Sequence, residues 1–185
     1  GVAPIQVWRR ANGDLEVISG RHRLDLAARS GETTIPAQVH DESAGFDAKR
    51  AAALDAELNI RDGQGRVRDY IQHFQATGIT REQADARGLL ARATGQRAYA
   101  IATDGDAELI AAHSAGQLSD EAAVSIARAA PRNSRLQAVG IKAVLDGKSI
   151  GNATNLMQAV KTMAAEGQGA AGGVPPPIEA VGGEV

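Results

Sequence analysis

Cysteine is absent from the 185 residues of this chain, and aromatic residues make up only 3% of it. Without cysteine there are no disulfides, no thiolate metal ligands and no thiol nucleophile, which is compatible with a reducing cytoplasm. With so few aromatic rings, a stacking platform for single-stranded bases is not expected. No apolar run approaches the roughly 20 residues that span a bilayer, so we expect no membrane partner.

An excess of charge of one sign is also lacking, since the formal net charge is −2. No global basic field therefore points to nucleic acid, and any such function must lie in a local patch. What the chain does contain is alanine, leucine, isoleucine and valine, a composition that favours closely packed helices. Its length allows one larger domain or two small ones. Because residue 1 is Gly rather than Met, we interpret the chain as a piece of a longer protein.

The first 45 residues have the pattern of a small α+β unit. Asn12-Gly13 lies between two strand-like runs and predicts a hairpin, because both residues accept a positive φ. Pro36 indicates an edge position or a strand end for the last strand. The expected elements are strands at 4–10 and 15–19, a helix at 20–30 and a strand at 33–40. We expect this β-β-α-β unit to lack its first strand or to lean on a partner.

The rest of the chain has helical patterns, in three further segments. A connecting helix and a glycine-rich break occupy 46–65, a helical domain occupies 66–165, and 166–185 is rich in Gly, Ala and Pro, which predicts a flexible linker or tail. The expected helices are 46–59, 66–76, 80–87, 94–102, 106–115, 119–130, 132–146 and 152–165. The expected N-caps are Thr80, which heads a capping box with Gln83, and Asp106, Ser119 and Asn152.

Three basic side chains, Arg21, His22 and Arg23, lie at the start of the helix expected at 20–30. Cations are unfavourable at a helix N-terminus, where the macrodipole is already positive, unless an anion lies among them. Ser19 and Gly20 lead directly into the free N–H groups of that N-terminus, and glycine lets a ligand approach the backbone closely. Arginine adds forked donors suited to phosphate oxygens. The five residues predict a phosphate site, although a solvated basic turn would give the same residues.

Residues 14–39, DLEVISGRHRLDLAARSGETTIPAQV, resemble the N-terminal domain of the ParB family together with sulfiredoxin, which share a fold. The GRHR box at 20–23 and the TIPAQV strand at 34–39 carry the resemblance. In these families the box binds nucleotide phosphates. Arg21 stands where the sulfiredoxin cysteine would fall, so the missing sulfur excludes sulfinic-acid reduction.

The stretch AELNIRDGQGRVRDY at 56–70 resembles the second box of ParB proteins, whose residues help to bind a nucleoside triphosphate and magnesium. The resemblance implies that Glu57 and Asn59 hold Mg²⁺, and that Asn59 and Arg61 help to bind the phosphates. The implied nucleotide is CTP, or ATP. The NIRDGQG variant resembles ParB-like domains of large phage and conjugative-element proteins.

Residues 79–103 occupy the position of the ParB helix-turn-helix, and SAGQLSDEAAVSIARAAP at 114–131 resembles the segment that follows it. The connection RGLLARATGQ is longer than the usual three or four residues. Side chains able to meet phosphates or base edges gather in this region, and a polar, solvated helix face would account for them too. They are Arg87, Arg92, Thr94, Gln96 and Arg97. Because a single such unit binds weakly, a homodimer is expected.

The resemblance therefore implies an α+β, ParB-like DNA-binding module from a plasmid, phage or partition-type system, located in the cytoplasm. Its partners would be DNA, a second copy and further domains, and its nucleotide would act as a switch with slow hydrolysis at most. One alternative is a metal-dependent nuclease on the same scaffold, suggested by His40, Asp41 and Glu42, which a charged strand end also explains. The other is an interaction domain that has lost the nucleotide. No catalytic residue is assigned.

Overall fold

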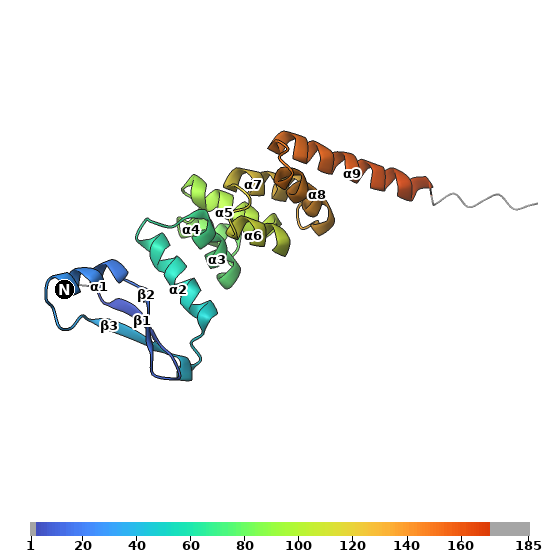
Figure 1. Cartoon of the computed structure of the whole chain (residues 1–185). Coiled ribbons are helices and arrows are strands. Elements are labelled where there is room, and N and C mark those ends of the chain that lie inside the picture. Colours follow the sequence, from blue (N-terminus) through green and yellow to red (C-terminus); the bar gives the residue numbers. More distant parts are fainter. Residues whose placement is uncertain (1–2, 171–185) are drawn as a thin grey trace, which may run out of the picture.

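The structure, a computed structural model, describes residues 3–170 and has the expected α+β class (Figure 1). The N-terminal elements are β1 (Ile5–Arg9), β2 (Leu15–Ser19), α1 (Arg21–Arg29), β3 (Ala37–Asp41) and the short 3-10 helix η1 (Glu42–Ala44). The helices that follow are α2 (Ala48–Arg61), α3 (Val67–Thr77), α4 (Arg81–Ala86), α5 (Ala93–Asp104), α6 (Ala107–Ser114), α7 (Asp120–Ala129), α8 (Ser134–Leu145) and α9 (Ile150–Ala170). The β-β-α-β order and the helical remainder confirm the fold class predicted from the sequence.

The sheet has the strand order β2-β1-β3, with β1 antiparallel to β2 and parallel to β3. The predicted hairpin joins β1 to β2, but its backbone differs from the expectation. Gly13 has a φ of 89° and donates its N–H to the carbonyl of Arg10 at 2.9 Å, whereas Asn12 is not in the positive-φ region. The reason is that the Asn12 Oδ1 accepts the N–H of Asp14 at 3.0 Å, so this side chain completes the turn instead.

The sheet is buried on one side by a small aromatic cluster. Trp8 is 3% exposed and packs edge-on against Phe46, with the ring centroids 5.9 Å apart. Phe46 in turn stacks on His40 at 4.7 Å, just before α2 begins. By contrast α1 buries none of its residues, and its Leu26 is 65% exposed. The sheet unit is therefore anchored mainly through α2, which packs on β2.

The main hydrophobic core lies among the helices. Ile101, Leu109 and Ile126 are 0% exposed and come from α5, α6 and α7. Gln137 of α8 is the polar side chain at the centre, also 0% exposed. Its Nε2 donates to the carbonyls of Asp104 at 2.7 Å and of Ala130 at 2.8 Å, and its Oε1 accepts the N–H of Asp106 at 2.8 Å.

The predicted N-cap residues do cap their helices, with one exception. Thr80, Asp106 and Ser119 each accept a backbone N–H three residues on, at 3.3, 2.8 and 3.1 Å. The prediction of Asn152 as an N-cap is wrong, because Asn152 lies inside the first turn of α9. Its own N–H donates to the Ser149 Oγ at 3.2 Å, so the serine hydroxyl satisfies that position.

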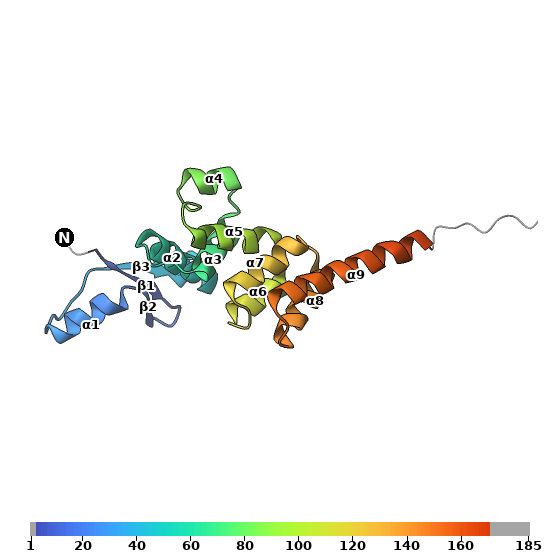
Figure 2. The same ribbon diagram turned by 90° about the horizontal axis from the view of Figure 1, so that it is seen from above.

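Helix α9 begins against α7 and α8, and its second half extends beyond them (Figures 1 and 2). Its first half packs through Ala153 and Met157, at 0% and 2% exposed, whereas Met163 is 70% exposed. The linker predicted from residue 166 is wrong for 166–170, since α9 continues through Ala170. The run MQAVKTMAAE at 157–166 consists mainly of helix formers, and the helix it starts continues through the two glycines of 166–170. The remainder of that segment, 171–185, lies outside the described residues.

Within residues 3–170, no helix combines the length and the hydropathy that crossing a membrane requires.

Candidate phosphate-binding and nucleic-acid interface

The loop between β2 and α1 is tightly built around Gly20. Gly20 has a φ of 100°, and a Cβ at this position would lie 2.6 Å from the Ile5 Cγ2. Only glycine therefore fits, for reasons of backbone conformation and of packing. No side chain caps the N-terminus of α1, so its free N–H groups face the predicted phosphate site. Ser19 ends β2 and is half-buried, and His22 is exposed.

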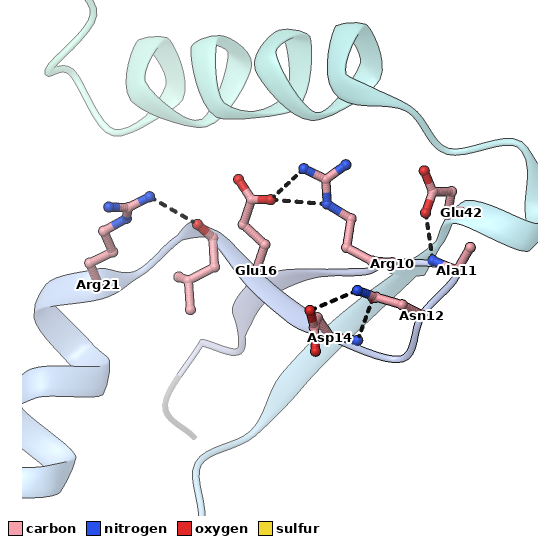
Figure 3. A network of polar contacts seen from close by, with 8 residues as sticks. Arg10, Ala11, Asn12, Asp14, Glu16, Arg21 and Glu42 are labelled. Carbon is pink, nitrogen blue, oxygen red and sulfur yellow. Dashed lines mark hydrogen bonds and ion pairs between the residues drawn. The ribbon is translucent and has the colours of Figure 1, made fainter.

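The two arginines of this loop have partners within the protein. Arg21 Nη2 lies 3.4 Å from the carbonyl oxygen of Val17 (Figure 3). Arg23 Nη1 donates to the carbonyl oxygens of Ala3 and of Pro4, the latter at 3.2 Å. These carbonyls account for the position of Arg23 at a helix N-terminus without any bound anion. The phosphate site at this loop therefore stays a prediction. Arg23 also has a structural role, because it binds these two carbonyls.

One charged group on α2 faces this loop. Burial raises the pKa of the Asp55 carboxyl, and the nearby charge of Asp69 raises it further, while Arg21, Arg68 and a hydrogen bond from Asn59 act in the opposite direction. Arg21 and Asn59, predicted from two separate sequence boxes, therefore lie near the same carboxylate. Sequence reasoning missed Asp55 and Arg68. The spacing of four between Asp55 and Asn59, which places both on one helix face, was the available signal.

Glu57 and Asn59 lie on different sides of α2. Residues two apart on a helix do not face each other. Asn59 is directed to Asp55, whereas Glu57 faces His73 of α3. The structure therefore does not bring the two predicted magnesium ligands together. In the described part of the chain, no group of three or more His, Asp or Glu side chains could hold a metal ion.

Glu57 and Arg61 instead line a cavity of about 460 Å³ with residues from the helix-turn-helix region. We call this cavity the arginine pocket; the residues that define it are Glu57, Arg61, His73, Arg87 and Arg92. Tyr70 forms part of its wall. Arg61 was expected to bind phosphate, and Arg87 and Arg92 to bind DNA, so the fold joins residues that the sequence assigned to two sites.

His73, on α3, is one of the titratable groups that line the arginine pocket. Burial lowers the pKa of the His73 imidazole, Glu57 raises it, and Arg87 lowers it. The histidine is therefore neutral at neutral pH and can both donate and accept hydrogen bonds. No local sequence pattern indicated His73, because α3 meets α2 and the segment after α4 only in the tertiary structure.

Helices α4 and α5 lie at the position predicted for the helix-turn-helix, and residues 87–92 join them. The long connection is held against α5 by two contacts. A Cβ on Gly95 would lie 1.7 Å from the carbonyl oxygen of Leu89, so the backbone crosses directly over this glycine. Gln96 Nε2 donates to the carbonyl oxygen of Leu90 at 2.9 Å. The first turn of α5 thus fixes the shape of the connection.

The predicted DNA-contacting residues divide into three exposed arginines and two polar residues, Gln96 and Thr94, that are bonded to the connection or half-buried. Arg87, Arg92 and Arg97 are exposed, the first two at the ends of the 87–92 connection and the third on α5. Gln96 is exposed as well, but its amide already binds the connection. Thr94 is half-buried and lines a separate cavity of about 650 Å³.

That separate cavity contains an ion-pair geometry that sequence reasoning missed. His113 Nε2 lies 2.6 Å from the Asp120 Oδ1, and His113 is 8% exposed. The pair joins the end of α6 to the first turn of α7, next to the GQLS sequence at 116–119. This contact gives the segment that resembles ParB a structural role.

Each of the three residues that suggested a nuclease has a polar partner within the sheet unit. His40 Nε2 lies 2.8 Å from the Gln6 Oε1, Asp41 forms an ion pair with Arg9 at 3.4 Å, and Glu42 accepts the N–H of Ala11 (Figure 3). These contacts are those of a charged strand end, which was the other explanation given for the three residues.

No family model matches the chain, and no curated protein sequence matches it. Among solved structures it is similar to the C-terminally truncated chromosome-partitioning protein ParB from Caulobacter crescentus, complexed to the centromeric parS site. The similarity has a TM-score of 0.44 at 18% identity and covers 85% of this chain and 83% of that chain. This is a limited likeness of fold.

Proposed function

We propose that this chain is a DNA-binding module that uses the α4–α5 helix-turn-helix. The observation that carries the proposal is the set of exposed arginines around the 87–92 connection. Within residues 3–170, Arg87, Arg92 and Arg97 have no carboxylate within ion-pair distance. Guanidinium groups without an internal partner are suited to backbone phosphates, which supply most of the affinity of DNA-binding proteins.

Local charge supports the proposal, although the whole chain carries −2. Residues 79–103 contain four arginines against two carboxylates, so this region is basic in an otherwise acidic protein. The N-terminus of α5 adds partial positive charge, and the N-cap Arg92 provides no side-chain cap to its N–H groups. A phosphate is the natural partner of such an end.

Fluorescence anisotropy with a labelled DNA duplex tests this proposal. A single unit of this kind binds with a Kd in the range of about 10⁻⁴ to 10⁻⁶ M at physiological salt. We expect Arg92→Ala and Arg97→Ala to weaken binding several-fold each, and to lower the slope of log affinity against log salt by about 0.9 per lost phosphate contact. Measurements from about 50 to about 200 mM salt give that slope.

Arg29→Ala and Arg135→Ala are the matched controls, because both remove an exposed arginine away from α4 and α5. If these two variants weaken binding as much as Arg92→Ala and Arg97→Ala, the interaction follows net charge alone and the proposed surface is wrong. If the folded wild-type protein does not bind duplex DNA at low salt, the proposed function is wrong.

The nucleotide switch remains a prediction. A nucleotide switch with CTP and Mg²⁺ is supported by the uncapped N-terminus of α1, whereas the Asp55 carboxylate, on which the charge of Arg21 acts, would repel a phosphate. The separation of Glu57 from Asn59 counts against that metal pair, so any Mg²⁺ would have to bind Asn59 with other oxygens. Origin in a mobile element, dimerisation and a cytoplasmic location also stay predictions.

A further inference from the structure

We propose that the arginine pocket binds a small phosphate-bearing molecule, and that this molecule competes with DNA for Arg87 and Arg92. The first half of this proposal stands by itself, and the second half rests on the proposed function. The pocket is distinct from the loop at Gly20–Arg23, since it lies on the opposite side of α2.

The charge of the pocket favours an anion. Three guanidinium groups, from Arg61, Arg87 and Arg92, line it against one carboxylate, that of Glu57. In the part of the chain that the structure describes, the only ion pair made by any of the three is the exposed contact of Arg61 with Asp62 at 3.7 Å. Their forked donors are thus available, and planar guanidinium groups match the oxygen spacing of phosphates.

Two helix C-termini meet at the pocket and partly explain the arginines. Arg61 ends α2 and Arg87 follows α4, where cations are favourable to the carbonyl ends. Each such end amounts to about half a negative charge, which leaves the pocket positive after both are counted. Arg92 has no such explanation, because it lies at the positive N-terminus of α5. A negative partner would therefore be favourable for a third arginine at this end.

The size and depth of the pocket favour a small molecule over the DNA backbone. Its volume of about 460 Å³ lies within the range of small-molecule sites, about 300 to 1,000 Å³. Four of its lining residues, Glu57, Arg61, Tyr70 and His73, belong to α2 and α3 rather than to the helix-turn-helix. An anion that contacts Arg61 together with Arg87 and Arg92 therefore bridges α2 and the 87–92 connection.

His73 makes anion binding dependent on pH. Glu57, Arg61, Tyr70, Arg87 and Arg92 line the same cavity as this imidazole. An anion bound among them offsets the arginine charges and raises the pKa of His73, so binding takes up a proton. The affinity of the pocket therefore increases as pH falls toward the lowered pKa of His73 in the free protein.

Calorimetric titration of inorganic pyrophosphate into the folded protein at low salt tests the pocket, with tripolyphosphate as a second probe. We expect both to bind wild type, more tightly at the lower pH, and Arg61→Ala to lose about tenfold in affinity or more. Arg29→Ala, which removes an exposed arginine elsewhere, is expected to bind like wild type. Equal binding by Arg61→Ala and wild type, or no binding to wild type, would overturn the site.

The competition is tested by adding pyrophosphate to the protein–DNA complex and following anisotropy. Displacement of DNA from wild type, and not from Arg61→Ala, supports the proposal, because Arg61 belongs to α2 rather than to α4 or α5; DNA binding by Arg61→Ala is measured first, without pyrophosphate. Failure to displace DNA at saturating pyrophosphate overturns the competition while the pocket stands. Failure of DNA binding itself is seen before any pyrophosphate is added, so the two proposals fail separately.

Discussion

The carbonyl oxygen of Leu89 lies over the Cα of Gly95, so that a Cβ on Gly95 would stand 1.7 Å from it. We predict that Gly95→Ala destabilises the protein by about 3 kcal/mol, as expected when an added methyl group meets backbone that cannot give way. The six-residue connection 87–92 would have to move, and DNA affinity should fall with it. Urea unfolding followed by circular dichroism gives the loss of stability.

Gly151→Ala is the matched control for this prediction. Gly151 also lies in a helix, but nothing lies within 4 Å of the position that its Cβ would take. The substitution should raise stability by up to about 1 kcal/mol, because alanine is the better helix former. If Gly95→Ala is as stable as wild type, the connection does not cross α5 as described.

Gln137→Met should cost about 3 kcal/mol or more of stability. The methionine keeps the volume but leaves the N–H of Asp106 without a partner, and the carbonyls of Asp104 and Ala130 keep only the backbone N–H groups of Arg132 and Asn133. Gln158→Ala, which removes an exposed glutamine from α9, should be close to neutral. A midpoint for Gln137→Met equal to that of wild type in urea would contradict the hydrogen-bond network.

Asp55→Asn should stabilise the protein at neutral pH. Because burial and Asp69 raise the pKa of Asp55 in the folded state, the native protein binds this proton more tightly than the unfolded chain does. The ionised carboxylate therefore lowers stability above the raised pKa, and this loss disappears as pH falls to the unfolded value, near 3.8. Unfolding free energies of both proteins across this range test the sign, and a gain for Asp55→Asn that grows toward acid pH would show it to be wrong.

Nucleotide binding is best tested with Arg21→Ala and His22→Ala rather than with Arg23→Ala. Arg23 holds the carbonyls of Ala3 and Pro4, so its removal should lower the melting temperature whether or not a nucleotide binds. If the loop binds CTP or ATP with Mg²⁺, Arg21→Ala should lose that binding and keep most of its stability. Titration calorimetry with each nucleotide decides this. Unchanged affinity in both Arg21→Ala and His22→Ala would remove the loop as a phosphate site.

Local signals along the sequence determined the elements and most of their ends. These signals act through contacts within a few residues, which the sequence order already specifies. Examples are the Thr80 and Ser119 caps, the hairpin at Asn12-Gly13 and the helix from Arg21. The errors there, at Asn152 and at 166–170, are also local, where a neighbouring hydroxyl or a run of helix formers outweighed the expected signal.

Only the tertiary structure decided which charged residues share a site. Glu57 and Arg61 were grouped with Asn59 because they are neighbours in sequence, yet the turn of α2 sends Asn59 toward Asp55 and the other two toward the cavity that Arg87 also lines. The packing of α3 on α2 then adds His73 to the second group. Side-chain direction on a helix changes by about 100° per residue, so residues that are close in the sequence point to different sides of the helix. Packing between helices then brings each of them close to residues that are distant in the sequence.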